Sequence, residues 1–272
     1  MIYTNINGKT VPATDAMVPA DNGAFRYGYG LFETMLVQDG AIRLKDYHWH
    51  RLFSGVERLG LDMPKLITSG MLEEQVLQLV AKNKLNKLCR VRLQLYAAGG
   101  GLYGLTTPHP GYVIECFPLP HDAMLLNENG LVVGFAEGIY KSADSLSNLK
   151  SCNALIYAIA ARQAKVRQWN DALVSNASGH IIETAIANIF WIKDGEVHTP
   201  PLADGCVSGV MRRHIIQAVG AITERTLTKD SLLDADEVFL TNAIKRIRWV
   251  GRIEDKAYRN EAIKKINSTL SL

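Results

Sequence analysis

A lysine in a polar loop is the first candidate for chemistry in this 272-residue chain. Lys150 stands in the segment Ser-Asn-Leu-Lys-Ser-Cys-Asn-Ala-Leu, residues 147–155, between an apolar stretch and a predicted apolar helix. An unpaired ammonium is costly in apolar surroundings, and such a lysine is the usual nucleophile for Schiff-base formation. Most lysines are solvated charges, so this reading needs support from other residues.

Two segments further along the chain provide that support. Glu183 interrupts an apolar stretch, where a carboxylate needs a cationic partner, either the protonated ring nitrogen of a cofactor or a protein cation in a structural ion pair. Gly209 precedes a predicted helix that begins with Val210 and Met211, and the free N–H groups at a helix start bind phosphate. A lysine, an acid and a phosphate-binding turn are what pyridoxal 5'-phosphate (PLP) needs from a protein, so together they predict a PLP site.

Alternating helices and strands must position these residues, which predicts an α/β (α+β) fold. Apolar periodicity predicts helices at 46–59, 71–82, 153–169 and 211–219. Short apolar runs predict strands that include 31–37, 88–98, 112–117, 131–135, 172–176, 181–183 and 237–240. A stretch rich in Pro, Asn, Asp and Gly separates two predicted domains, an N-terminal domain at 1–118 and a C-terminal domain at 131–272, with 119–130 as the linker.

One predicted strand, 88–98, carries charge on a single face. Its apolar residues alternate with Arg90, Arg92, Gln94 and Tyr96. Two arginines and a tyrosine on one face either line an anion-binding pocket or form a solvated outer surface, and the pattern alone leaves both open.

The bulk composition narrows the class of protein. Hydrophobic residues make up 47% and charged residues 21% of the chain, and the net charge is only +3, which argues against nucleic acid and polybasic membrane partners. No apolar run approaches the roughly 18 residues of a membrane span, and the N-terminus has no signal-peptide pattern. The four cysteines lack metal-binding spacing, so we expect reduced thiols, no metal and a cytoplasmic protein.

At these motifs the chain resembles the class IV aminotransferase family, the fold type IV PLP enzymes. That family includes branched-chain aminotransferases, D-amino-acid aminotransferases and 4-amino-4-deoxychorismate lyases. Residues 26–34, Arg-Tyr-Gly-Tyr-Gly-Leu-Phe-Glu-Thr, are similar to its N-terminal motif YGDGLFET, and residues 48–52, His-Trp-His-Arg-Leu, to its motif H-x-x-R-L. The resemblance covers nearly the whole chain.

The resemblance implies a role for each matching residue. Lys150 would form the Schiff base with PLP and move protons, Glu183 would keep the ring nitrogen protonated, and Arg51 would bind the phosphate. Val210 and Met211, after Gly209, would give the phosphate backbone N–H groups. Asn188, in the family's Asn-x-Phe position, would be structural rather than catalytic. The implied architecture is two α/β domains with the cofactor in the cleft between them, in a homodimer.

Three positions depart from the family pattern. Tyr29 replaces the aspartate of the N-terminal motif, and Ser208 replaces the proline common before Gly209. Ala243 stands where aminotransferases often have a phosphate-contacting threonine. The first change concerns the substrate, and the last removes one phosphate contact that Arg51 and the glycine turn can offset.

The residues around the lysine favour one branch of the family. Branched-chain enzymes usually carry Asn-Tyr four and five positions after the lysine, where this chain has Ala154 and Leu155. Instead Asn153 lies three positions after it, as in lyases and D-amino-acid aminotransferases. Segments 96–105, 187–191, 209–212 and 241–243 look most like the lyases. We therefore expect a 4-amino-4-deoxychorismate lyase, which makes 4-aminobenzoate and pyruvate on the way to folate. The candidates for holding the substrate's carboxylates are Arg26, Tyr29, Arg92, Tyr96, Tyr103 and Asn242.

Two other readings remain. An aminotransferase would use the same lysine, with D-amino acids favoured over branched-chain substrates because of Asn153 and the missing tyrosine. A PLP carrier without catalysis is the third, and the intact set of Lys150, Glu183 and Arg51 argues against it.

Overall fold

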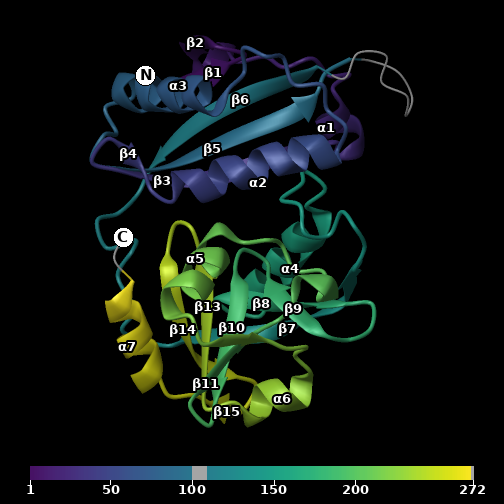
Figure 1. The fold of residues 1–272 in the computed structure, drawn as a ribbon, viewed down its shortest axis with the longest axis vertical. Helices are drawn as coiled ribbons and strands as arrows, with labels where there is room; N and C mark the ends of the chain where they lie inside the picture. Colours follow the sequence, from purple (N-terminus) through teal and green to yellow (C-terminus); the bar gives the residue numbers. More distant parts are fainter. Residues whose placement is uncertain (100–108, 271–272) are drawn as a thin grey trace. The chain divides into compact units, whose positions relative to one another are not determined.

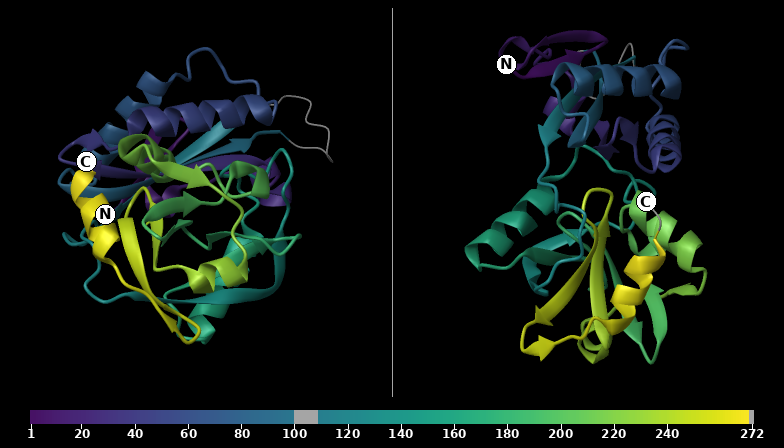
Figure 2. Two further views of the ribbon diagram at one scale, coloured as in Figure 1. Left: turned by 60° about the horizontal axis from the view of Figure 1, so that its bottom comes forward. Right: turned by 90° about the vertical axis from the view of Figure 1, so that its left-hand side faces the viewer.

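The computed structural model describes residues 1–99 and 109–270, which fold into two compact units (Figures 1 and 2). The first unit contains residues 1–123 and 149–153, and the second contains 124–148 and the chain from 154 onward. The sequence-based division placed 149–153 in the C-terminal domain. The structure differs there because the backbone of this segment pairs with a strand of the first unit.

The first unit is a six-stranded antiparallel sheet with helices packed on it. The strands lie in the order β2-β1-β6-β5-β3-β4. In Figure 1, α2 and α3 run along this sheet. The elements are β1 (Tyr3–Ile6), β2 (Lys9–Pro12), η1 (Ala13–Asp15), α1 (Gly23–Tyr27), β3 (Gly30–Gln38), β4 (Ala41–Ile42), α2 (Lys45–Arg58), α3 (Ser69–Lys82), β5 (Leu88–Ala97) and β6 (Pro110–Pro118).

The two long helices of this unit follow from the spacing of their apolar residues, as predicted. Helix α2 buries His48, Trp49, Leu52 and Val56, which recur on one face. Helix α3 buries Leu72, Val76, Leu79 and Val80 in the same way, and the Thr68 side chain accepts the Met71 N–H at its start. The buried apolar residues of both helices pack in one hydrophobic core with Val91, Leu93 and Leu95, which point inward from β5.

The other face of β5 is neither a uniform pocket lining nor a solvated surface. Arg90 is exposed, with its guanidinium 4.4 Å from the ring centroid of Phe117. Arg92 is half-buried and donates a 2.7 Å hydrogen bond to Gln94. Tyr96 is buried, because Gly111 on β6 leaves room for its ring. The polar side chains on this face therefore become less exposed toward the C-terminal end of β5.

The second unit is built on a nine-stranded mixed sheet with the order β12-β11-β10-β13-β14-β7-β8-β9, and β15 pairs with β14. A further pairing between β9 and β10 closes part of this sheet into a ring of strands. Its elements are β7 (Leu131–Lys141), α4 (Leu155–Val166), β8 (Asp171–Asn176), β9 (Ile181–Thr184), β10 (Asn188–Lys193), β11 (Glu196–Thr199), η2 (Leu202–Asp204), α5 (Val210–Val219), β12 (Ile222–Glu224), α6 (Lys229–Asp234), β13 (Glu237–Asn242), β14 (Arg246–Ile253), β15 (Lys256–Ala257) and α7 (Glu261–Thr269).

Strand β7 is longer than the sequence predicted. The predicted strand ended at Phe135, whereas β7 continues to Lys141 after an irregular register against β8 between Phe135 and Tyr140. This extension carries Lys141 into the interior of the unit, where only 8% of the residue is exposed. Among the described residues, no helix is long and apolar enough to cross a membrane.

Candidate active site

The segment that carries Lys150 is tied to β3 through its backbone. The Lys150 carbonyl accepts a 2.9 Å hydrogen bond from the Phe32 N–H, and the Cys152 N–H donates 2.8 Å to the Gly30 carbonyl. The Lys150 side chain is half-buried, and its Nζ lies 4.4 Å from the ring centroid of Phe32. Two motifs more than a hundred residues apart in the sequence therefore form one local structure.

Two glycines of the N-terminal motif allow this close approach. A Cβ at Gly30 would lie 2.4 Å from the Leu95 carbonyl oxygen of β5 and 3.1 Å from Cys152 Sγ in the lysine segment. Gly28 has a φ of +69° and ends α1, and a Cβ there would lie 3.0 Å from the Cα of Asn153. The glycine spacing of residues 28–30 is therefore needed to hold the lysine segment against β3.

Arg51 lies in the same unit and is held by a buried carboxylate. Its Nε donates a 2.8 Å hydrogen bond to Glu33 Oε1, and its Nη2 contacts Glu33 Oε2 at 2.5 Å. His48, one helical turn earlier on α2, contacts the same Oε2 through Nδ1 at 2.5 Å. The motif H-x-x-R-L thus places both side chains on Glu33 of β3, and this two-pronged contact fixes the plane of the guanidinium.

The surroundings of Glu33 and His48 determine which of the two side chains is charged. Burial acts to raise the pKa of Glu33, but the positive charge of Arg51 and the hydrogen bonds from Arg51 and His48 lower it to about 2. Burial lowers the pKa of His48, and the Glu33 carboxylate offsets this only in part. We therefore assign a neutral imidazole whose Nδ1–H donates to an ionised Glu33. Its buried Nε2 has no hydrogen-bond partner within the described residues.

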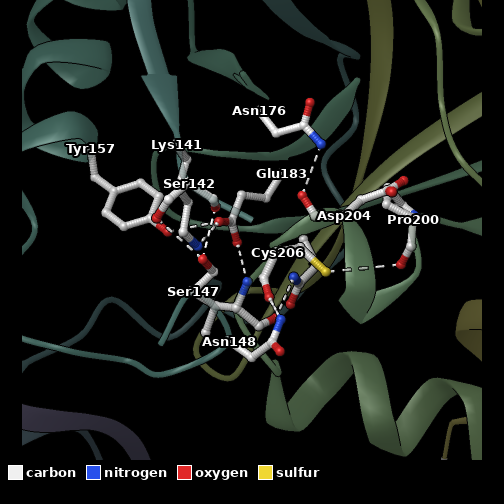
Figure 3. Close-up of polar contacts among 12 residues, drawn as sticks. Lys141, Ser142, Ser147, Asn148, Tyr157, Asn176, Glu183, Pro200, Asp204 and Cys206 are labelled. Carbon is white, nitrogen blue, oxygen red and sulfur yellow. Dashed lines mark hydrogen bonds and ion pairs between the residues drawn. The ribbon is translucent and has the colours of Figure 1, made fainter. Parts of the chain in front are cut away.

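Glu183, in the second unit, receives three hydrogen bonds (Figure 3). Lys141 Nζ and the Tyr157 hydroxyl each donate to Oε1 at 2.7 Å, and the Val207 N–H donates to Oε2 at 2.9 Å. The sequence left open whether the cationic partner of this carboxylate would come from the protein. The structure supplies a protein cation, Lys141, and Glu183 keeps acceptor capacity for a further donor because a carboxylate offers about four lone-pair sites.

Hydrogen bonds to the side chains of Asn148, Asn188 and Glu183 hold the turn before α5 in place. Asn148 Nδ2 donates 2.7 Å hydrogen bonds to the carbonyls of Leu202 and Cys206, and the Ser208 N–H donates to the Asn148 carbonyl at 3.0 Å. Asn188 Nδ2 donates to the Val207 carbonyl at 2.9 Å. These bonds and that from Val207 to Glu183 fix the chain just before the helix start.

Helix α5 begins after Gly209, as the sequence predicted. A Cβ at Gly209 would lie 1.9 Å from Asn188 Oδ1, so only glycine leaves room for that side chain. No side chain caps this helix, whose first residues are Val210 and Met211. The first N–H groups of a helix lack intrahelical acceptors and bind anions. The donor set at this turn therefore fits a phosphate group.

The predicted substrate-binding residues differ in their surroundings. The Tyr29 hydroxyl donates to the Leu59 carbonyl at 2.5 Å, and Asn242 accepts hydrogen bonds from the N–H groups of Ile244 and Lys245. Both side chains thus hold loops. Arg92 lies with its guanidinium 3.9 Å from the ring centroid of Phe32, the ring that also contacts Lys150. Arg26 is exposed at the end of α1, Tyr96 is buried, and Tyr103 lies outside the described residues.

The predicted cofactor-binding residues form two groups, one in each unit. The first group is Lys150 with Arg51, and the second is Glu183 with Asn188, Gly209, Val210 and Met211. Sequence reasoning missed the partners that hold these groups, which are Glu33, His48, Lys141 and Tyr157. Glu33 carries the same signal that identified Glu183, a carboxylate in an apolar strand.

Known proteins match most of this chain. Residues 30–253 match the model of a family described as amino-transferase class IV. The aminodeoxychorismate lyase of Vibrio harveyi is 27% identical over 233 residues, 84% of this chain and 84% of its own length. That of Bacillus subtilis is 28% identical over 274 residues, 96% of this chain and 89% of its own.

Aminotransferases match as well. The D-alanine aminotransferase of a Staphylococcus epidermidis strain is 26% identical over 261 residues, 92% of this chain and 88% of its own length. The crystal structure of a branched-chain aminotransferase from Thermoproteus uzoniensis with norvaline gives a TM-score of 0.88 at 24% identity, covering 98% of this chain and 93% of that one. This likeness confirms the predicted fold.

Proposed function

Because the chain belongs to the amino-transferase class IV family, whose members are PLP-dependent enzymes, we propose that it is a 4-amino-4-deoxychorismate lyase. It would convert this substrate to 4-aminobenzoate and pyruvate, a step toward folate. The observation that carries the proposal is the likeness of segments 96–105, 187–191, 209–212 and 241–243 to the lyases, while Asn153 and Leu155 after Lys150 argue against the branched-chain enzymes. Two named lyases among the relatives support it.

The residues described above fit PLP. Val210 and Met211, at the uncapped start of α5, would donate N–H groups to the phosphate, and Arg51 would add a charge-assisted hydrogen bond. Glu183 would accept from the ring nitrogen, and Lys150 would hold the aldehyde carbon. The proposal requires that both groups of residues act on one cofactor.

The bound cofactor would supply an electron sink for the negative charge that develops beside the substrate nitrogen. Lys150 Nζ would remove the proton from the ring carbon that carries this nitrogen. Loss of the enolpyruvyl oxygen from the neighbouring carbon would complete the aromatic ring, and the same Nζ would return a proton to the departing group, giving pyruvate. Arg92, beside the Phe32 ring, is our first choice for holding a substrate carboxylate, with Arg26, Tyr29, Tyr96, Tyr103 and Asn242 as the other candidates.

The alternative is an aminotransferase, since a D-alanine aminotransferase matches at nearly the same identity. Lys150 would then deliver its proton to the cofactor carbon that becomes the pyridoxamine carbon, instead of promoting elimination. The first steps of the two reactions are the same, so the residues that bind PLP do not separate them.

The test begins with an absorbance spectrum of purified protein reconstituted with PLP. We expect a Schiff-base band that is absent from Lys150→Ala. Incubation with aminodeoxychorismate should then release pyruvate and 4-aminobenzoate in equal amounts. Conversion to the pyridoxamine form by D-alanine or L-leucine, without pyruvate release from aminodeoxychorismate, would establish the aminotransferase instead.

A homodimer and a cytoplasmic location are further parts of this proposal, taken from the family. Light scattering on the PLP-loaded protein would measure the first. Fractionation of the producing cells would measure the second.

A further inference from the structure

The ion pair at Glu183 involves the residue proposed to accept from the ring nitrogen. Lys141 Nζ lies 2.7 Å from Glu183 Oε1, and the two side chains are 10% and 4% exposed. Figure 3 shows Lys141 and Tyr157 meeting at Glu183, with Lys141 at the end of β7. Water screens such a buried pair weakly, so its charge acts on whatever else contacts the carboxylate.

Tyr157 and Cys206, two further titratable residues of the described chain beside this carboxylate, are neutral. Burial, and then the negative charge of Glu183, raise the pKa of the Tyr157 hydroxyl far above its ordinary value. Burial and Glu183 also raise the pKa of the Cys206 thiol, to about 12. Among the described residues that hydrogen-bond to Glu183, only Lys141 therefore brings a positive charge.

We propose that Lys141 is a positioning residue that shares Glu183 with the ring nitrogen of PLP and keeps that nitrogen less protonated than an unpaired carboxylate would. The inference rests on the proposed function, which makes Glu183 the partner of the ring nitrogen. A cation already bound to the carboxylate offsets part of its negative charge, so the carboxylate stabilises a second cation less.

The consequence for the reaction is a weaker electron sink. Such a sink suits the proposed elimination, because formation of the aromatic ring of 4-aminobenzoate itself favours loss of the proton. Transamination gains no aromatic product and so depends more on the cofactor. The Lys141–Glu183 pair thereby links a contact in the second unit to the choice of reaction.

The test uses the PLP-loaded protein, with ¹⁵N in the pyridine ring, and measures the ¹⁵N chemical shift. Lys141→Met should move this shift toward the protonated value at neutral pH. Lys141→Arg, which keeps the charge, should restore the native shift, and Lys165→Met, which removes an exposed lysine of α4, should leave it unchanged. The same shift in Lys141→Met and native protein would overturn the proposal.

A second readout needs no catalysis. In the cofactor-free protein, Lys141→Met removes the cation that is paired with Glu183. The protonated ring nitrogen of PLP would then supply the missing positive charge. The variant should therefore bind PLP about tenfold more tightly than the native protein. Tyr157→Phe removes a hydrogen bond but no charge and should not tighten binding. Equal or weaker binding by Lys141→Met would contradict the inference.

Two outcomes separate this inference from the proposed function. If the native protein forms no Schiff base with PLP, both fail. If it binds PLP through Lys150 and releases pyruvate, but the ¹⁵N chemical shift does not depend on the charge at position 141, only the role of Lys141 fails. Lys141→Gln, which keeps a hydrogen-bond donor without the charge, replaces Lys141→Met in both measurements if the methionine variant does not fold.

Discussion

Two buried carboxylates on apolar strands, Glu33 and Glu183, are used differently in the two units. Glu33 is bound by two side chains of one helix, Arg51 and His48, one turn apart on α2. Glu183 collects donors from the end of β7, from α4 and from the turn before α5. Glu33 thus orients one arginine, whereas Glu183 joins three parts of its unit and is itself the group proposed to contact the cofactor.

The largest effect is expected when the Glu33 charge is removed. Glu33→Gln removes the carboxylate charge that faces the Arg51 guanidinium, which is 12% exposed, and should lower the free energy of unfolding by about 3–5 kcal/mol. Chemical denaturation of the cofactor-free protein measures this. Glu73→Gln, in the more exposed pair with Lys45, is the matched control and should cost about 1 kcal/mol or less. Equal costs would show that Glu33 has no special role.

Acid should affect the Glu33 cluster in a defined pH range. The pKa of Glu33 falls from an ordinary 4.5 to about 2 in the folded protein, so its contribution is complete above about pH 4.5 and is lost as the pH falls toward 2. The contribution amounts to about 3 kcal/mol. Denaturation between pH 6 and 2.5 should show this loss in the native protein, and Glu33→Gln should flatten the curve. A parallel acid profile in the variant would locate the sensitivity elsewhere.

The turn beside Glu183 gives a test of the second region. Gly209→Ala places a methyl group 1.9 Å from Asn188 Oδ1, so Asn188 or the turn must move, at a cost of about 2–3 kcal/mol. Thermal melting and PLP titration should show lower stability and weaker cofactor binding. Gly70→Ala in α3, where the nearest atom lies 3.9 Å from the added Cβ, is the control and should be neutral or slightly stabilising. Unchanged PLP affinity in Gly209→Ala would separate this turn from the phosphate.

The smallest effect is expected at Tyr157. Tyr157→Phe removes the hydroxyl that donates to Glu183 Oε1 but leaves the Lys141 ion pair, so it should cost about 1–2 kcal/mol in chemical denaturation. Tyr29→Phe, whose hydroxyl donates to a backbone carbonyl, is the comparison in the first unit. A cost well above that of Glu33→Gln would reverse the ranking of the two regions.

The sequence predicted elements best where the apolar spacing is regular. The helices at α2 and α3 and the strand at β5 were predicted within a few residues, because their apolar residues recur at regular spacing over the whole element. Lys150, Glu183 and Gly209 could be selected because each is unusual for its surroundings. The structure places these residues in two groups, one in each unit, and their roles remain predictions.

The partners of these residues were harder to predict, for physical reasons. Lys141 follows an irregular stretch of β7, where the register against β8 shifts and the alternation is lost. Tyr157 lies on a short helix whose apolar residues gave no sign of the inward hydroxyl. The return of residues 149–153 to the first unit depends on backbone hydrogen bonds with β3, which leave no pattern in side-chain types.

That return has a consequence for how such a protein can be divided or recombined. The chain passes between the units at 123–124, at 148–149 and at 153–154. A fragment cut after residue 123 would lose both Lys150 and the segment that pairs with β3. Neither unit is therefore one continuous stretch of the sequence. To exchange the first unit between relatives, residues 149–153 would have to be exchanged together with residues 1–123.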